Sequence, residues 1–280
     1  MYAASRCWSV ERQGWYSFVF VSDGDYVFGE DVQEERERLA AVERAVDGSS
    51  RNALLEVGVD VGWRCWEVGA GRGSIARWLS VVVGTAGQVL ATDLTDEWFD
   101  PAATDVRFQR HDVVRDPVPE GAFDLVHARF LLEHLADPRS VIARLIDALR
   151  PGGVIVLEDS AGLELDITPS PGLTDEFLRA WERAGRAVGW NPFYGAELMV
   201  DLRALELREL GGRQCRELAP GGPSWIHVAH GLRRVERQLI EQGISQVDLK
   251  LVLRSLADPA SLIVGPAVTI AWARRAGVAS

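Results

Sequence analysis

The stretch that decides the fold is Arg64-Cys-Trp-Glu67-Val-Gly69-Ala-Gly71-Arg-Gly73-Ser-Ile75. Its first residues predict a buried strand, and the three alternating glycines predict a tight turn that opens a helix. Glycine allows the backbone to turn sharply and to come close to a ligand. The first N–H groups of a helix have no partner within the helix and can face that ligand. The stretch therefore predicts a nucleotide-like cofactor at the carboxyl end of a parallel strand.

The spacing of the glycines separates two kinds of cofactor. A dinucleotide site requires G-x-G-x-x-G, but Ser74 stands where the third glycine would be, and Gly73 comes one residue early. This spacing disfavours an NAD-dependent oxidoreductase. A glycine-rich turn alone is also compatible with an ordinary connection between a strand and a helix.

Further strands are predicted downstream, alternating with helical patterns as in a doubly wound parallel sheet. They cover Gln88–Asp93, Val106–Val113, Phe123–Arg129 and Val154–Asp159. Asp93 stands roughly 20 residues after the glycine turn, where an acid can accept hydrogen bonds from ribose hydroxyls. It could instead cap a following helix.

Four motifs in this order resemble those of class I S-adenosylmethionine (SAM) dependent methyltransferases. They are E-x-G-x-G-x-G from Glu67, His111-Asp-Val after the third strand, Phe123-Asp-Leu-Val on the fourth, and Arg150-Pro-Gly-Gly before the fifth. The chain is most similar to the ubiquinone/menaquinone-type and natural-product small-molecule groups, from about Asp25 to Asp159.

The resemblance implies an α/β, Rossmann-like class I methyltransferase fold: a doubly wound seven-stranded sheet with its last strand antiparallel, plus a helical substrate lid. Residues 1–25 would form an N-terminal arm, residues 26–159 the SAM-binding core, and residues 160–280 the lid helices and final strands. Residues 211–218 and 268–274 are the expected sixth and last strands, and 225–241 and 246–256 the expected helices. Gly48-Ser-Ser50 is expected to break the helical pattern of residues 30–57 into two helices.

The resemblance also implies which residues bind the cofactor. Glu67 would orient the amino group of SAM through a water molecule, Asp93 would hold the ribose, and Asp112 with Val113 would hold the adenine. The carbonyl of Ala128 or Arg129 would accept a hydrogen bond from the amine. The full expected set is Tyr26, Arg38, Glu67, Gly69, Ala70, Gly71, Gly73, Asp93, Leu94, His111, Asp112, Val113, Ala128 and Arg129.

Two residues of this set also have structural interpretations that do not involve the cofactor. Tyr26 is placed to cover bound SAM, but it could also be a packed core residue. Arg38 could reach the carboxylate of the methionine moiety, or form a surface ion pair.

The acceptor pocket is expected where the fourth and fifth strands end. His134 and His127 are the candidate bases or orienting groups there, because histidine titrates near neutral pH; either could instead be a hydrogen-bonded interior residue. The candidate acceptor-binding residues are Phe130, Asp159, Trp181, Phe193 and Tyr194. Their aromatic rings favour an apolar or aromatic small molecule, or else form the core of the lid.

Composition limits the partners. The net charge of −11 argues against a nucleic-acid groove and against an anionic membrane surface, because both require a basic face. Three widely separated cysteines and no C-x-x-C pair argue against a disulfide framework, so a cytoplasmic location is expected. His227 and His230 lack an evident third ligand, so no metal is expected. The apolar segment Trp15–Val21 could pack on the chain itself or join subunits into a homo-oligomer.

The leading hypothesis is an enzyme that transfers a methyl group from SAM to an apolar or aromatic small molecule, by C- or O-methylation in secondary metabolism. The alternative is a catalytically silent SAM-binding protein with a regulatory or scaffolding function, because a complete cofactor site does not prove turnover.

Overall fold

The computed structural model describes residues 32–100, 105–169 and 174–277. The N-terminal arm of residues 1–25, with its expected oligomer contact, and Tyr26 lie outside these residues. Within the described ranges, no helix is long and apolar enough to cross a membrane.

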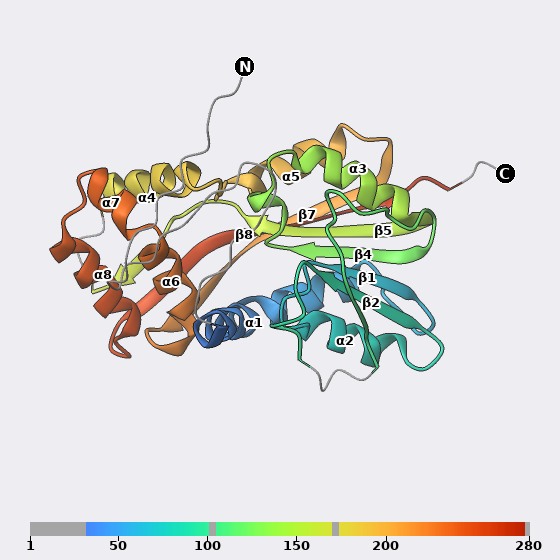
Figure 1. The fold of residues 1–280 in the computed structure, drawn as a ribbon, viewed down its shortest axis with the longest axis horizontal. Helices are drawn as coiled ribbons and strands as arrows, with labels where there is room; N and C mark the ends of the chain where they lie inside the picture. Colours follow the sequence, from blue (N-terminus) through green and yellow to red (C-terminus); the bar gives the residue numbers. More distant parts are fainter. Residues whose placement is uncertain (1–31, 101–104, 170–173, 278–280) are drawn as a thin grey trace, which may run out of the picture.

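One mixed sheet organises the molecule (Figure 1). Its parallel part has the order β3-β2-β1-β4-β5. These strands are β1 (Arg64–Val68), β2 (Gln88–Asp93), β3 (Arg107–Arg110), β4 (Phe123–Arg129) and β5 (Leu149–Ser160). The glycine turn thus follows a central strand, and the ends of β1, β2 and β4 lie side by side.

The remaining strands run antiparallel. Strand β8 (Leu262–Arg275) pairs with β5, and β7 (Leu207–Pro220) pairs with β8. The expected antiparallel last strand between the fifth and sixth strands is confirmed. The short strand β6 (Asp166–Thr168) also pairs with β8 and gives the sheet an eighth strand that the sequence did not predict.

Helices cover both faces of the sheet. Helices α1 (Val32–Glu56) and α2 (Ser74–Val83) lie on one face, and α3 (Pro138–Ala148) and α5 (Tyr194–Arg203) on the other (Figure 1). Alternation along the strands separates two hydrophobic clusters: Trp66 and Val126 pack on the α3 face, whereas Cys65 and Leu125 pack on the α2 face. Glu67 and His127 therefore point towards α1 and α2.

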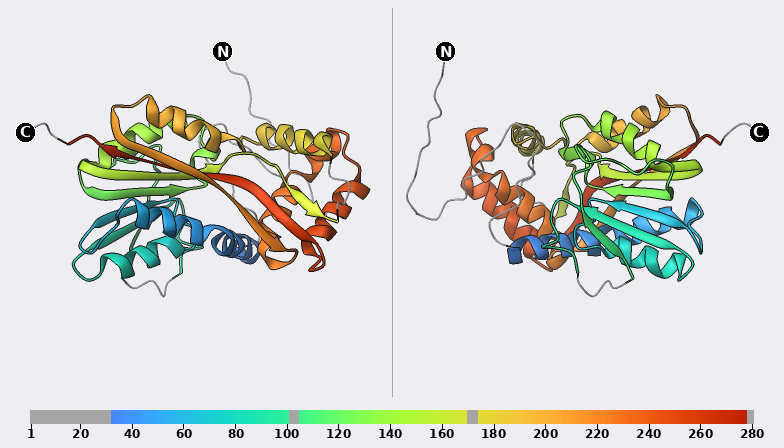
Figure 2. Two further views of the ribbon diagram at one scale, coloured as in Figure 1. Left: turned by 180° about the vertical axis from the view of Figure 1, so that it is seen from behind. Right: turned by 45° about the vertical axis from the view of Figure 1, so that its right-hand side comes forward.

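A helical region stands at the end of the sheet, where β7 and β8 extend to it (Figure 2). It contains α4 (Asp175–Ala187), η2 (Pro223–Trp225), α6 (Ile226–Arg234), α7 (Glu236–Glu241) and α8 (Gln246–Ala257). These elements surround a third hydrophobic cluster that includes Phe177, Trp225 and Leu232.

Two helix predictions were wrong. Helix α1 continues through Gly48-Ser-Ser50, because Ser50 Oγ lies 3.1 Å from the carbonyl of Val46 and 2.8 Å from Glu158 Oε2, and is therefore satisfied inside the helix. The single helix expected over 225–241 is divided at Val235, whose backbone leaves helical geometry (φ −106°, ψ 16°) while its side chain is buried in the third cluster.

Candidate functional site

The glycine turn has the conformation that its sequence predicts. Gly69, Gly71 and Gly73 all have positive φ, at 69°, 53° and 80°, and Gly73 is the N-cap of α2. The N–H of Ala70 donates to the carbonyl of Thr92, which fixes the turn to β2. A Cβ on Gly73 would lie 2.4 Å from the ring of Phe99. Position 73 therefore requires glycine both for its backbone and for the approach of this ring.

Asp93 fastens the end of β2 to this turn. Its Oδ2 accepts a 2.8 Å hydrogen bond from the N–H of Gly71, and its Oδ1 accepts one of 2.7 Å from the N–H of Leu94. Burial raises the pKa of Asp93 above its ordinary value, although these backbone hydrogen bonds oppose the shift. The side chain of Leu94 is partly exposed beside it. The carboxylate thus orders both the glycine turn and the start of the loop after β2.

The third strand leads into His111, Asp112 and Val113 next to Asp93. The N–H of His111 donates to the carbonyl of Asp93, and Val113 is buried. Asp112 Oδ1 accepts from the N–H of Val114. His111 Nδ1 is buried and has no hydrogen-bond partner among the described residues, so this position fits a polar ligand such as the expected cofactor.

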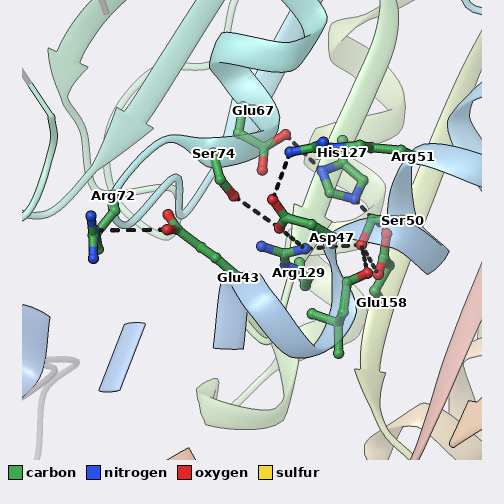
Figure 3. A network of polar contacts seen from close by, with 11 residues as sticks. Glu43, Asp47, Ser50, Arg51, Glu67, Arg72, Ser74, His127, Arg129 and Glu158 are labelled. Carbon is green, nitrogen blue, oxygen red and sulfur yellow. Dashed lines mark hydrogen bonds and ion pairs between the residues drawn. The ribbon is translucent and has the colours of Figure 1, made fainter. Parts of the chain in front are cut away.

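Glu67 and His127 begin a buried chain of polar contacts (Figure 3). His127 is fully buried, with Nδ1 2.6 Å from Glu67 Oε2 and Nε2 2.9 Å from Glu158 Oε1. The three side chains come from the adjacent strands β1, β4 and β5. His127 was a candidate base, but carboxylates hold both of its ring nitrogens inside the sheet. The structure therefore argues against direct contact between His127 and an acceptor.

Helix α1, on the face of the sheet to which Glu67 and His127 point, completes this network. Ser50 Oγ contacts Glu158 and accepts a 2.9 Å hydrogen bond from Arg129 Nη1. Arg129 also pairs with Asp47 at 3.0 Å, and Asp47 accepts from Ser74 Oγ at the start of α2. The end of β4, helix α1 and the glycine turn are therefore joined by direct hydrogen bonds. Ala128, beside Arg129, pairs with Val68 and lies next to the turn.

The protonation of His127 should appear in the stability of the protein. Burial alone would lower the pKa of His127, but Glu67 and Glu158 outweigh it and raise the pKa to about 9. A raised histidine pKa stabilises the folded state fully below about pH 6.5 and loses that contribution as the pH rises through 9. At roughly 1.4 kcal/mol for each pKa unit, the loss is about 3 kcal/mol.

We therefore expect the free energy of unfolding to fall between pH 6.5 and 9 by about 3 kcal/mol more in the wild type than in His127→Gln. Urea unfolding at both pH values measures this difference. If the free energy of unfolding falls equally in the two proteins, the result would contradict a charged His127.

The ends of β4 and β5 carry a second polar group. The N–H of Glu133, in η1 (Leu132–His134), donates to Asp159 Oδ1, and the N–H of Ser160 donates to Glu133 Oε2. Burial and the charge of Glu133 raise the pKa of Asp159 well above its ordinary value. His134 Nε2 lies 3.5 Å from Glu133 Oε1. Glu133, His134 and Asp159 therefore meet where the acceptor pocket was expected.

Histidine 134 is a weak base in this setting. Burial, Arg38 and Arg234 lower the pKa of His134 to about 3, so its imidazole is neutral at pH 7. Of the two alternatives from the sequence, an orienting group fits better than a proton acceptor. Arg38 itself forms a bidentate ion pair with Glu35 at 2.6 and 2.9 Å, and this pair is largely buried rather than on the surface.

The predicted acceptor-binding aromatics divide into two pairs. Trp181 is buried in the core of the helical region, and Tyr194, the first residue of α5, is buried with its hydroxyl donating to Asp201 at 2.7 Å. Both rings pack in hydrophobic cores, which favours a structural interpretation of these two residues over contact with an acceptor. Phe130 and Phe193 are half-buried. The segment of Phe193 approaches η1, since the N–H of Asn191 donates to the carbonyl of Glu133 at 2.8 Å.

Sequence reasoning missed Asp47, Ser50 and Glu158, although one signal was present. Glu158 follows the apolar residues 154–157 within the expected strand Val154–Asp159, and a carboxylate buried there needs a partner from another element. Among the residues that the structure describes, no group of three or more His, Cys, Asp or Glu side chains could hold a metal ion.

Comparisons with known proteins identify methyltransferases as relatives. Str2, a methyltransferase from Strobilurus tenacellus, is 32% identical over 181 residues, which are 63% of this chain and 65% of str2. The ubiquinone/menaquinone biosynthesis C-methyltransferase UbiE from Stutzerimonas stutzeri is 32% identical over 109 residues, 35% of this chain and 43% of UbiE. The chain thus spans less than two thirds of the length of either relative.

Solved structures and a family model complete the comparison. The fold is similar to that of YcgJ from Bacillus subtilis, with a TM-score of 0.56 at 19% identity over 82% of this chain and 100% of YcgJ. A protein from Bacillus halodurans C-125 gives 0.53 at 17% identity over 81% and 99%. The model of the methyltransferase domain matches residues 28–205. The fold is that of class I methyltransferases. Because the family match covers more than half of the sequence, the chain belongs to the methyltransferase-domain family.

Proposed function

We propose that this chain methylates an apolar or aromatic small molecule at carbon or oxygen, in secondary metabolism. The observation that carries the proposal is the site at the ends of β4 and β5. There, Glu133, His134 and Asp159 lie close to segments that bear the half-buried rings of Phe130 and Phe193. Apolar walls with a few placed polar groups are typical of small-molecule sites. The name of str2 supports methyl transfer, and the name of UbiE, a C-methyltransferase of ubiquinone/menaquinone biosynthesis, supports a small-molecule acceptor.

A second set of residues, at or just after the carboxyl ends of β1, β2, β3 and β4, would hold the cofactor. We assign Asp93 to the ribose, Asp112 and Val113 to the adenine, and Glu67 with the carbonyl of Ala128 or Arg129 to the amino group. When bound, SAM supplies a methyl group on a positively charged sulfur, so the protein does not have to activate the electrophile. Its residues must align the acceptor with that group and exclude water. The neutral His134 beside Glu133 would orient a polar group of the acceptor.

Asp93→Ala tests the cofactor assignment. Because it removes the acceptor that orders Gly71 and would hold the ribose, S-adenosylhomocysteine should bind more weakly by about 1–3 kcal/mol. Isothermal titration calorimetry measures the affinity, and circular dichroism checks that the variant is folded. An unchanged affinity in a folded variant would refute the ribose assignment.

Transfer itself is tested with SAM that carries an isotopic methyl group. The protein is incubated with small-molecule extracts and with defined phenols and quinols, and the labelled product is identified by mass spectrometry. Label in an apolar or aromatic product supports the proposal. Binding of S-adenosylhomocysteine without any transfer would favour the alternative, a silent SAM-binding regulatory or scaffold protein.

A further inference from the structure

A histidine between two glutamates is buried on one face of the central strands. His127 touches Glu67 on one side and Glu158 on the other, at 2.6 and 2.9 Å, and has no exposed surface. The register sets Glu67 directly beside His127, and Glu158 two residues beyond the partner of His127 on β5. The three side chains therefore share one face of the sheet, at the end where the glycine turn begins.

The chemistry of this arrangement requires two ring protons. A neutral imidazole has one N–H donor, whereas an imidazolium has two. With only one proton, one carboxylate would face a ring lone pair at hydrogen-bond distance. Among the other charged groups nearby, Arg129 on β4 and Asp159 on β5 interact with Glu158, and Arg129 also pairs with Asp47 on α1 at 3.0 Å. An imidazolium thus has a local anionic partner on each side.

Because Glu67 stands just before the glycine turn, the charge of His127 bears on cofactor binding. A glutamate side chain has several rotatable bonds, and ordering it at the moment of binding weakens affinity. The bond from His127 Nδ1 already fixes Oε2 of Glu67, which leaves Oε1 to accept from another donor. Glu158 holds the far side of the ring and is itself bonded to Ser50 on α1.

We propose that His127 is a positioning residue for the cofactor: its imidazolium fixes the carboxylate of Glu67 towards the amino group of SAM and connects it, through Glu158 and Ser50, to helix α1. This inference rests on the proposed assignment of Glu67. His127 touches neither the acceptor nor the transferred methyl group. Its effect should be confined to ligands that carry the amino acid end of the cofactor.

The test compares two ligands with the same adenosine. S-adenosylhomocysteine carries the amino group, and 5′-methylthioadenosine lacks the amino acid end. His127→Gln should raise the Kd for S-adenosylhomocysteine about tenfold or more, as expected for a hydrogen bond to a charged group, and leave the Kd for 5′-methylthioadenosine within about twofold. Equal losses for both ligands, or no loss for either, would overturn the proposal. His230→Gln, on α6, is the matched control and should change neither Kd.

Double substitution separates this proposal from the assignment on which it rests. If His127 acts through Glu67, the variant with both His127→Gln and Glu67→Gln should bind S-adenosylhomocysteine no more weakly than Glu67→Gln alone. If the affinity of the double variant instead falls by the product of the two single losses, the inference is overturned. Wild-type affinity in Glu67→Gln would instead refute the assignment of Glu67 to the amino group, and the inference with it.

The wild-type protein provides a test that does not depend on the folding of a variant. The chain has five histidines, so ¹⁵N-histidine labelling gives a simple spectrum. At pH 7 the ring of His127 should show both nitrogens protonated. A neutral tautomer of His127 would overturn the proposal.

Discussion

Gly73→Val is expected to raise the Kd for S-adenosylhomocysteine at least about a hundredfold. The backbone of Gly73 has a φ of 80°, a conformation that a β-branched residue rarely adopts. Its Cβ would also lie 2.4 Å from Phe99 Cε2 and 3.0 Å from Phe99 Cδ2. The turn and the ring therefore cannot both keep their positions. Since Gly73 caps α2, the first N–H groups of that helix would move as well.

Position 71, in the same turn, leaves more room for a side chain than position 73. Its φ is 53°, and an added Cβ would meet Leu39 at 3.6 Å, an ordinary contact distance. Position 73 is thus the stricter test of whether this turn binds the cofactor. The sequence alone ranks the two glycines equally, because the obstacle at position 73 is a ring 26 residues further along the chain.

Calorimetry with S-adenosylhomocysteine measures the loss, and circular dichroism monitors the fold. Gly84→Val is the matched control: Gly84 caps the other end of α2 with a φ of 63°, and nothing lies within 4 Å of an added Cβ. It imposes similar backbone strain without blocking the turn and should leave the affinity within about twofold. Normal binding by Gly73→Val would mean that the cofactor lies elsewhere.

Local sequence patterns were sufficient for the strands that form the site. The expected bounds of the second and fourth strands, Gln88–Asp93 and Phe123–Arg129, match β2 and β4. Short apolar runs that end at a polar residue fix such strands, since parallel strands are buried on both faces. The glycine turn was equally predictable, because positive φ at alternate positions strongly favours glycine.

Contacts between distant elements were not predictable in the same way. Ser50 and Glu158 are 108 residues apart, and nothing in either local pattern shows that α1 crosses β5 at this point. The same limit explains Trp181 and Tyr194. An aromatic residue in a helix satisfies a buried core and a ligand wall equally well, and only the packing of α4 against α7 and of α5 against β8 decides between them.

The fully buried Glu158 also carries a large expected effect on stability. Glu158→Ala should lower the free energy of unfolding by about 3–5 kcal/mol, because removal of one partner from a buried ion pair leaves the other charge uncompensated. Burial alone would raise the pKa of Glu158, but the hydrogen bond and charge of His127, with Arg129 and Ser50, hold it below its ordinary value. The carboxylate is therefore charged and bound on both sides.

Urea unfolding at pH 7 measures this loss as a lower midpoint with an unchanged slope. Glu56→Ala is the matched control, since Glu56 also forms an ion pair, with Arg213, but is 54% exposed. Exposed pairs contribute about 0–1 kcal/mol, so the two glutamates should differ several-fold in their effect on stability. If they cost the same, Glu158 and His127 would not be a charged pair, and the link between helix α1 and the glutamate at the glycine turn would lose its physical basis.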